Sequence, residues 1–202
     1  MSIALAPAAP STLLDLLDRS RVRDAVAIVG FALLTALAAQ ISIPLGFTPV
    51  PLTGQTFAVL LAGGVLGSRR GGLSMLLYVA LGAIGLPFYA EGTGGWTAAT
   101  GATAGYLVGF IVAAVVVGLM AEHGQDRKLS TSIPAFLAGT IIIYTVGAGW
   151  LAFDLGLPLT AAAGESSAVS LGVAPFLVGD VFKALLAGAM LPAAWRFLDD
   201  AR

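Results

Sequence analysis

Six long apolar stretches alternate along the chain with short segments that are polar or rich in glycine and proline. The stretches are residues 25–45, 52–67, 72–84, 102–121, 133–153 and 173–197, and the first five contain no charged side chain. A helix needs about 20 apolar residues to cross the roughly 30 Å of hydrocarbon in a bilayer. The pattern therefore predicts an all-α integral membrane protein with six transmembrane helices, of which the second and third are short.

Composition supports the membrane assignment. Hydrophobic residues make up 58% of the 202 residues, only 10% are charged, and the mean hydropathy is +0.95. A soluble domain is about 25% charged. The charges in "LLDLLDRSRVRD" follow the first apolar residues of the chain, whereas a secretory signal places its charges first. We expect residues 1–24 to form an amphipathic segment on the membrane surface and residues 25–202 to form one six-helix domain.

Basic residues lie on one side of this six-helix arrangement. Nine of the ten fall in the N-terminal segment, in the second-to-third and fourth-to-fifth connections, or near the C-terminus. Because cytoplasmic loops carry an excess of Lys and Arg, both termini are expected in the cytoplasm. The nine residues are Arg19, Arg21, Arg23, Arg69, Arg70, Arg127, Lys128, Arg196 and Arg202. The other loops carry only Glu91, Asp154 and Glu165, and the tenth basic residue, Lys183, falls inside the last span.

Several classes of chemistry are excluded. A net charge of −1 gives no electrostatic footprint for nucleic acid. The chain has no cysteine, so disulfides, thiolate metal sites and cysteine catalysis are ruled out. No Walker A motif is present, so the chain does not hydrolyse ATP by that route. The single histidine, His123, lies in the charged run "AEHGQDRK" and is expected to be a solvated loop residue.

The loops on the other side are unusually rich in Gly, Pro, Thr and aromatic residues. They read "GFTPVPLTGQTF" and "GLPFYAEGTGGWTAATGATAGY". Irregular backbone at membrane depth occurs where it is buried in protein or lines a cavity, so these loops could line an outward-facing pocket. Alternatively, they are ordinary turns in which Tyr89 and Trp96 belong to an interfacial aromatic belt. The loops alone do not decide between the two.

The sixth stretch contains an acid and a base three residues apart, Asp180 and Lys183, in "FLVGDVFKALLAG". Residues i and i+3 share a helix face. A charged side chain inside a membrane costs roughly 3 kcal/mol or more and usually marks a ligand or ion pathway. The pair could instead be an intrahelical ion pair that only supports packing. An adjacent carboxylate and ammonium suit a ligand with N–H donors and an acceptor, such as a ureido group.

At this point the sequence resembles a known family. The segments "PVPLTGQTFAVLLAGGVLGSRRG", "LGAIGLPFYAEGTGG" and "VGDVFKALLAG" are similar to the BioY family, the biotin-binding S components of energy-coupling-factor (ECF) transporters. The resemblance implies six helices, an outward-facing biotin pocket and a first loop that acts as a lid, and no cofactor. It places Gly179, Asp180 and Lys183 on the family's Gly-Asp-x-x-Lys motif.

The resemblance also extends to the start of the fourth stretch, where the family often has Gly-Pro-Thr-Gly-Gly-Tyr. Here the residues are "GATAGY", in which Thr103, Gly105 and Tyr106 match while Ala102 and Ala104 depart from the pattern. With Asp180 and Lys183, we expect four residues at the pocket mouth to contact biotin, and these are Gln55, Tyr89, Thr103 and Tyr106.

The resemblance further implies partners in a bacterial cytoplasmic membrane. These are a transmembrane coupling subunit and two ABC-type ATPase subunits, which agrees with the missing Walker A motif, and the S component is implied to topple in the membrane to release biotin inward. The family docks its coupling subunit through Ala-x-x-x-Ala in the first helix, a pattern that Ala32 and Ala36 match. Small residues four apart let helices approach closely, so close packing within the chain's own bundle is the alternative.

Other functions fit the residues less well. An intramembrane aspartyl protease would need two carboxylates that share a proton, but Lys183 favours ionised Asp180 and position 177 is Leu where that family has Gly. A solitary ion-coupled carrier would rely on a sparse relay of one acid and one base. A membrane scaffold leaves the buried pair unexplained. An S component for a different vitamin stays open, and we expect the chain not to be an enzyme.

Overall fold

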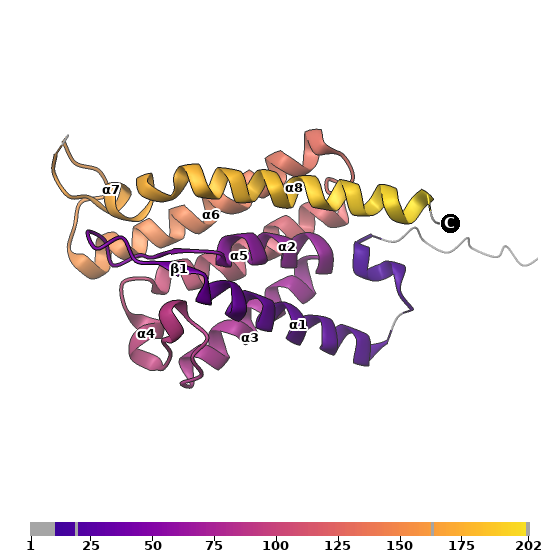
Figure 1. Ribbon diagram of the computed structural model, residues 1–202, viewed down its shortest axis with the longest axis horizontal. Coiled ribbons are helices and arrows are strands. Elements are labelled where there is room, and N and C mark those ends of the chain that lie inside the picture. Colours follow the sequence, from indigo (N-terminus) through magenta and orange to yellow (C-terminus); the bar gives the residue numbers. More distant parts are fainter. Residues whose placement is uncertain (1–10, 19, 163, 201–202) are drawn as a thin grey trace, which may run out of the picture.

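The structure of the protein is a computed structural model that describes residues 11–18, 20–162 and 164–200. These residues are mostly helical, and the longer helices run along the long axis of the molecule (Figure 1). The longer helices are α1 (Arg21–Gln40), α2 (Gln55–Leu66), α3 (Ser68–Ala83), α5 (Ala104–Glu122), α6 (Leu129–Leu155) and α8 (Leu177–Asp200). The shorter elements are η1 (Leu13–Leu16), β1 (Ser42–Ile43), β2 (Leu52–Thr53), η2 (Ala90–Gly92), α4 (Trp96–Thr100), α7 (Ala168–Gly172) and η3 (Ala174–Phe176).

Helix α5 occupies the centre of the bundle, where it packs against α2, α3 and α6. Glycines make these contacts close. A Cβ atom on Gly109 would lie 3.1 Å from the Cα of Ile143 in α6, and one on Gly118 would lie 2.3 Å from the backbone nitrogen of Ser68 in α3. Helices that lack side chains at the contact can bring their backbones together. The outer helices α1 and α8 then cover this core from two sides.

Within the described residues, four helical segments are long and apolar enough to span a membrane. They are Arg21–Gln40, Ala104–Glu122, Leu129–Leu155 and Ala168–Leu198, the last of which joins α7, η3 and α8. Helix α2 has 12 residues and α3 has 16, so they are about 18 and 24 Å long at 1.5 Å per residue. The all-helical membrane class is thus confirmed. The count of six spans and the location of the termini stay predictions.

A single residue connects α2 to α3. Gly67 has a φ of +81°, a region that glycine enters without the steric cost of a Cβ. Glu122, at the end of α5, accepts hydrogen bonds from the backbone nitrogen and the hydroxyl of Ser68 at 2.7 and 2.8 Å. An acidic group at a helix N-terminus is favourable. The turn between α2 and α3 is therefore held against the end of α5.

A β-hairpin follows α1 and replaces the end of the expected first span. Ser42 pairs with Thr53 and Ile43 with Leu52, antiparallel. The helix ends at Gln40 rather than at residue 45, because Pro44 disfavours helical backbone in the residue before it and cannot donate to the helix itself. The helix also begins earlier than expected, at Arg21, since the hydroxyl of Ser20 accepts from the backbone nitrogens of Val22 and Arg23.

The described part of the N-terminal segment packs on the turn between α2 and α3. Asp15 in η1 accepts a hydrogen bond from Arg70 at 3.0 Å, and Arg70 also pairs with Asp24 at 3.0 Å. Burial opposes ionisation of Asp15, but hydrogen bonds from Ser11, Thr12 and Arg70 outweigh it and keep the pKa of Asp15 below its ordinary value. The segment is therefore joined to the bundle by ion pairs, and its first ten residues lie outside the described part.

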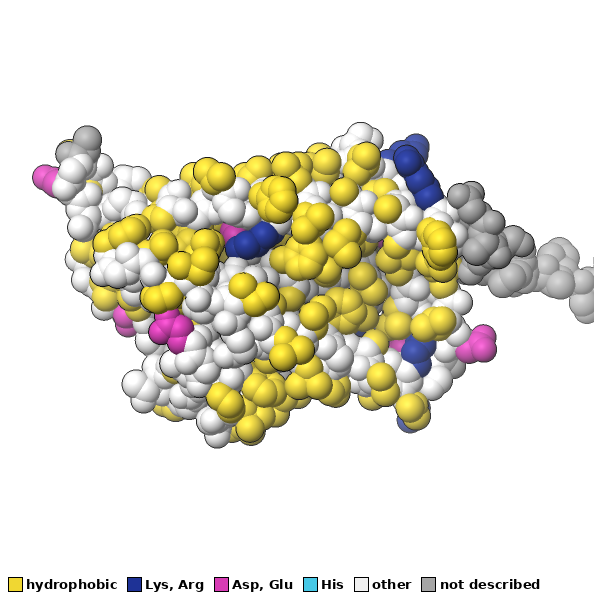
Figure 2. All heavy atoms as spheres, in the orientation of Figure 1, with side chains coloured by type: hydrophobic (Ala, Val, Ile, Leu, Met, Phe, Trp, Pro, Cys, Tyr) yellow, Lys and Arg dark blue, Asp and Glu magenta, His cyan; other side chains and the backbone are white. Residues whose placement is uncertain are grey.

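The surface of the molecule carries the pattern expected in a bilayer. Figure 2 shows hydrophobic side chains spread over the face that α1 and α8 form, with basic side chains toward one end and a further one, Lys183, near the middle of the face. Large apolar side chains of α1 and α8 are exposed, and examples are Val22, Val26, Leu37, Val178 and Phe182. Such a broad apolar surface would be a liability in water. It is what contact with lipid hydrocarbon requires.

Candidate substrate-binding site

A cavity of about 310 Å³ lies between the hairpin, the α3–α5 connection and helices α2, α5, α6 and α8. It contains all six residues that the sequence predicted to contact the ligand, namely Gln55, Tyr89, Thr103, Tyr106, Asp180 and Lys183. Apolar side chains form the rest of its deeper wall, including Leu107, Phe110, Ile143 and Phe176. Segments that are more than 120 residues apart along the chain thus meet around one hollow.

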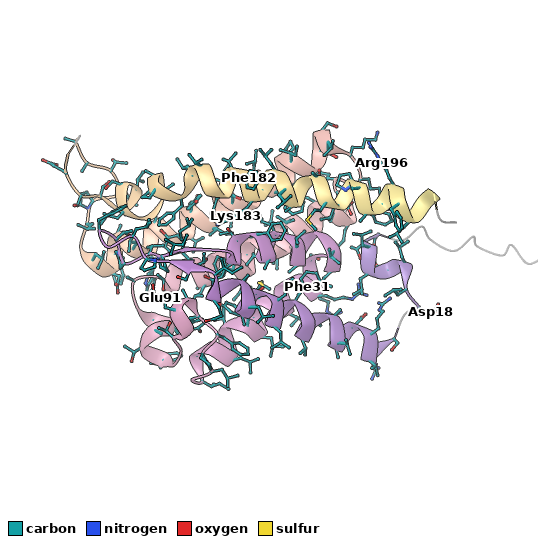
Figure 3. The ribbon with its side chains drawn as sticks, viewed as in Figure 1. Asp18, Phe31, Glu91, Phe182, Lys183 and Arg196 are labelled. Atoms are coloured by element: carbon teal, nitrogen blue, oxygen red, sulfur yellow. The ribbon has the colours of Figure 1, made fainter. Side chains whose placement is uncertain are left out.

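Asp180 and Lys183 form an ion pair within α8. The ammonium nitrogen of Lys183 lies 2.6 Å from Oδ1 of Asp180. Asp180 is 4% exposed, whereas the Lys183 side chain is 19% exposed, so the base is the more accessible partner. Figure 3 shows Lys183 directed from α8 toward the hairpin and the start of α2. The expectation that the two side chains project together is confirmed.

Both members of the pair have further partners. Lys183 donates to the backbone oxygen of Thr53 and lies 3.4 Å from the hydroxyl of Thr56. Thr56 donates to Oδ1 of Asp180 at 3.1 Å, and Tyr144 in α6 donates to Oδ2 at 2.7 Å. Burying a carboxylate costs much free energy unless it is paired and hydrogen-bonded, so these hydrogen bonds reduce the cost of burying Asp180. The pair therefore joins three helices, α2, α6 and α8, at the wall of the cavity.

The sequence analysis missed Tyr144, Thr53 and Thr56. Tyr144 lies in the uncharged apolar stretch 133–153, 36 residues before Asp180, and no local spacing links the two. Thr53 contributes its backbone oxygen, which its residue type does not reveal. The motif "PLTGQTF" did mark this loop as unusual, so the signal pointed to the segment but not to the atoms.

The hydroxyls of two predicted pocket tyrosines are already bound within the protein. Tyr106 donates to the backbone oxygen of Gly172 at 2.8 Å, and Tyr89 donates to that of Val79 at 2.7 Å. Gln55 donates from Nε2 to the hydroxyl of Tyr78. Because both hydroxyls are bound within the protein, the ligand contacts predicted for Tyr89 and Tyr106 would come from their rings, which line the cavity.

The hairpin lines one side of the cavity, and a hydrogen bond joins it to α7. Pro49, Val50 and Pro51 line the cavity, and the hydroxyl of Thr48 donates to the backbone oxygen of Leu171 in α7 at 2.8 Å. Across the mouth, Glu91 lines the α3–α4 side with a φ of +59°, a conformation that is uncommon for residues other than glycine. Figure 3 shows Glu91 at this end of the molecule.

The two alanines predicted to dock a partner lie inside the bundle. Ala32 is 0% exposed and Ala36 is 6% exposed, and both belong to the main apolar core together with Met75 of α3. This burial is what the alternative, close packing within the chain, requires. Docking through these positions stays a prediction. In the described part of the chain, other residues cover both alanine side chains.

Comparison with known proteins gives one consistent result. A family model described as the BioY family matches residues 10–200. The chain is 39% identical over 176 residues to the biotin transporter BioY of Rhizobium etli, covering 83% of this chain and 90% of that one. It is 44% identical over 161 residues to the biotin transporter BioY of Rhodobacter capsulatus, with coverages of 78% and 84%.

A solved structure is also similar throughout its length. It is the crystal structure of the S component for biotin from an ECF-type ABC transporter, with a TM-score of 0.77 and 27% sequence identity. The match covers 89% of this chain and 95% of the other. The helical bundle described above is therefore shared with that protein. From the family match and the identities to its members, this chain belongs to the BioY family.

Proposed function

We propose that this chain binds biotin in the cavity above Asp180 and Lys183 and is the substrate-specific S component of an ECF-type transporter. The observation that carries the proposal is a buried ion pair on the wall of an otherwise largely apolar cavity. Relatives at 39% and 44% identity are named biotin transporters. The function is transport and not catalysis, since the family and its named members are biotin transporters.

The cavity and the ligand are chemically complementary. Biotin has a ureido ring with two N–H donors and one carbonyl oxygen, an apolar thioether ring and a carboxylate-bearing chain. The ureido N–H groups would donate to Asp180 and an acceptor oxygen would bind Lys183, which are charge-assisted hydrogen bonds. Phe110, Ile143 and Phe176 would contact the thioether ring. A volume of about 310 Å³ is near the lower end of the range for small-molecule pockets.

We further propose that both termini are cytoplasmic and that the cavity faces outward. The basic end supports this arrangement, because contacts tie its parts together. Arg70 pairs with Asp15 of the N-terminal segment, and Arg127 of the α5–α6 connection stacks on Trp195 of α8 at 4.5 Å. The cavity is lined by the segments at the other end of these helices. Cytoplasmic ends of membrane proteins are the basic ones.

The partners proposed for this S component are a transmembrane coupling subunit and two ATPase subunits in a bacterial cytoplasmic membrane. The solved relative is described as a component of an ECF-type ABC transporter. The sequence of this chain contains no Walker A motif, so ATP-driven uptake would need ATPases supplied by other subunits. Ala32 and Ala36 remain the predicted docking pair, with their burial as the observation against it.

Ligand identification in the purified protein tests the proposal. The protein is purified in mild detergent from cells grown with biotin, and the bound small molecule is released and identified by mass spectrometry. We expect biotin, and titration calorimetry on ligand-free protein should show tight binding of biotin and none of thiamine or riboflavin. Recovery of a different vitamin, with no heat on biotin addition, would overturn biotin as the substrate and leave the S-component assignment to the uptake experiment below.

An uptake experiment separates the S component from a solitary carrier. Radiolabelled biotin uptake is measured in a biotin-auxotrophic host that lacks coupling subunits, with the chain expressed alone or with an ECF module. We expect the module to increase uptake and an ATPase-inactive module to remove the increase. Full uptake by the chain alone, abolished by a protonophore, would favour an ion-coupled carrier instead.

A further inference from the structure

A second hollow lies on the outside of the bundle, away from the biotin cavity. It is a groove of about 320 Å³ between α3 and α5. Its α3 wall consists of Ser68, Arg69, Gly72, Leu73 and Leu76, and its α5 wall of Ile111 and Val115. The α3 residues recur at helical spacing and so share one face. Gly72 brings α3 close to α5, since a Cβ there would lie 2.6 Å from Cγ2 of Val115.

The groove is apolar along its length and cationic at one end. Leu73 and Leu76 are exposed at 45% and 51%, so their side chains would meet lipid in a membrane. Arg69 lies at the basic end of α3 and its side chain borders the groove. The length of the groove is thus suited to an alkyl chain, and the end at Arg69 is suited to an anion.

Arg69 differs from its neighbour Arg70 in its partners. Arg70 is bound by Asp15 and Asp24. Arg69 is exposed, and among residues 11–18, 20–162 and 164–198 no carboxylate lies within 4.0 Å of its guanidinium. The nearby carboxylate of Glu122 is bound to the backbone nitrogen and hydroxyl of Ser68. Within the part of the chain that the structure describes, the cation at the end of the groove is therefore without an ion-pair partner.

We propose that this groove binds one anionic phospholipid, with its phosphate on Arg69 and an acyl chain along Leu73, Leu76, Ile111 and Val115. A guanidinium binds phosphate through two parallel hydrogen bonds. Basic sites between membrane helices on the cytoplasmic side are known to hold anionic headgroups. The occupant must be amphipathic, because the anion site and the apolar groove are continuous. The proposal rests on the membrane placement of the chain and not on its substrate.

Native mass spectrometry tests the site with lipids of matched tails. Purified protein is mixed with phosphatidylglycerol or phosphatidylcholine of the same chain length, and the lipid-bound fraction is measured. We expect preferential retention of phosphatidylglycerol, reduced on the order of fivefold by Arg69→Gln, since one cation near a membrane is worth about 1 kcal/mol. Arg69→Lys should retain most of the preference. Arg21→Gln is the matched control, because Arg21 is exposed on α1 and outside the groove.

Three outcomes would overturn the proposal. The first is an equal loss of phosphatidylglycerol in Arg69→Gln and Arg21→Gln, which would indicate a diffuse charge effect. The second is competition by inorganic phosphate as effective as that by long-chain lipid, which would indicate a free-anion site. The third is an unchanged lipid preference in Arg69→Gln together with loss of coupling-subunit assembly, which would make the groove a protein contact. Biotin binding by each variant, expected to match the parent, shows that the protein is folded.

Discussion

At the scale of single residues, the Asp180–Lys183 pair is the feature that explains most about this protein. Replacing a buried ion pair by apolar residues is often neutral or stabilising, so stability alone does not account for the pair. Its hydrogen bonds to Thr56, Tyr144 and the backbone of Thr53 reduce the cost of burial. They also hold the carboxylate and the ammonium in fixed positions on the cavity wall, which is what recognition of a small polar group requires.

Removing both charges distinguishes recognition from packing. The double variant Asp180→Asn/Lys183→Met should fold, because no orphan charge remains, but should bind biotin at least a hundredfold more weakly. Each lost charge-assisted hydrogen bond is worth roughly 1.5–3 kcal/mol, and about 1.4 kcal/mol is tenfold in affinity. Calorimetry on the purified variant measures the change. Lys128→Met/Asp154→Asn removes one base and one acid outside the cavity and serves as control. Affinity within about threefold of the parent would show that the pair only supports packing.

At the scale of elements, helix α1 presents two different sides. Ala32, Thr35, Ala36 and Ala39 are buried, whereas Gly30, Leu33 and Leu37 are exposed. The hydroxyl of Thr35 donates to the backbone oxygen of Phe31 at 2.9 Å and lies 3.8 Å from the sulfur of Met75 in α3. The small residues thus bring α1 close to the bundle. The hairpin that follows α1 is joined to α7 through Thr48, so this part of the chain also covers the cavity.

Adding volume on either side of α1 tests this arrangement. Ala36→Leu should destabilise the isolated protein, because overpacking a filled core costs about 1–3 kcal/mol. Gly30→Leu is the matched control, since a Cβ there meets no atom of another element within 4 Å, and it should not lower the melting temperature, because replacing a glycine inside a helix removes its entropic cost. Thermal unfolding in detergent measures both. A stable Ala36→Leu protein that binds biotin but loses module-dependent uptake would instead support the predicted docking role of Ala36.

At the scale of the whole molecule, charge and polarity divide the protein into a basic end and a cavity end. Asp126 in the α5–α6 connection accepts a hydrogen bond from Trp195 of α8, over which Arg127 stacks. Burial raises the pKa of Asp126 above its ordinary value, although the hydrogen bond from Trp195 and the charge of Arg127 oppose the shift. Asp126 is 2% exposed. A buried carboxylate therefore links the α5–α6 connection to α8 at the basic end of the bundle.

The stability of the protein should depend on pH through Asp126. A carboxyl whose pKa is raised by folding favours the folded state when protonated, and this contribution is lost as pH rises through the folded pKa. Asp126→Asn should therefore raise the melting temperature at pH 8, and the gain should shrink toward acidic pH, where the parent is neutral too. Scanning fluorimetry measures the difference. Asp18→Asn, at an exposed site, should show no such trend, and a gain for Asp126→Asn that is constant with pH would contradict the assignment.

Much of this architecture could be predicted from the sequence because hydropathy and charge act locally. Each apolar stretch corresponds to a helix, and the end of the bundle that carries the basic residues was expected from their spacing. The acid and base in α8 share a face by helical geometry alone. These properties need no knowledge of which segments are neighbours, since the bilayer imposes them on each stretch separately.

Tertiary contacts were needed for everything that depends on the direction of a side chain or on a distant partner. In helices that are apolar on all sides, spacing does not reveal which face is buried, so Ala32 and Ala36 could not be assigned to the core. The hydroxyls of Tyr89 and Tyr106 donate to backbone oxygens. Every residue has such an oxygen, so the sequence does not indicate which one accepts. Tyr144 reaches Asp180 only because α6 and α8 pack together. The sequence supplied the charges of the site, and the packing of α2, α6 and α8 determined how they are held, because hydrogen bonds over such separations exist only once the helices have assembled.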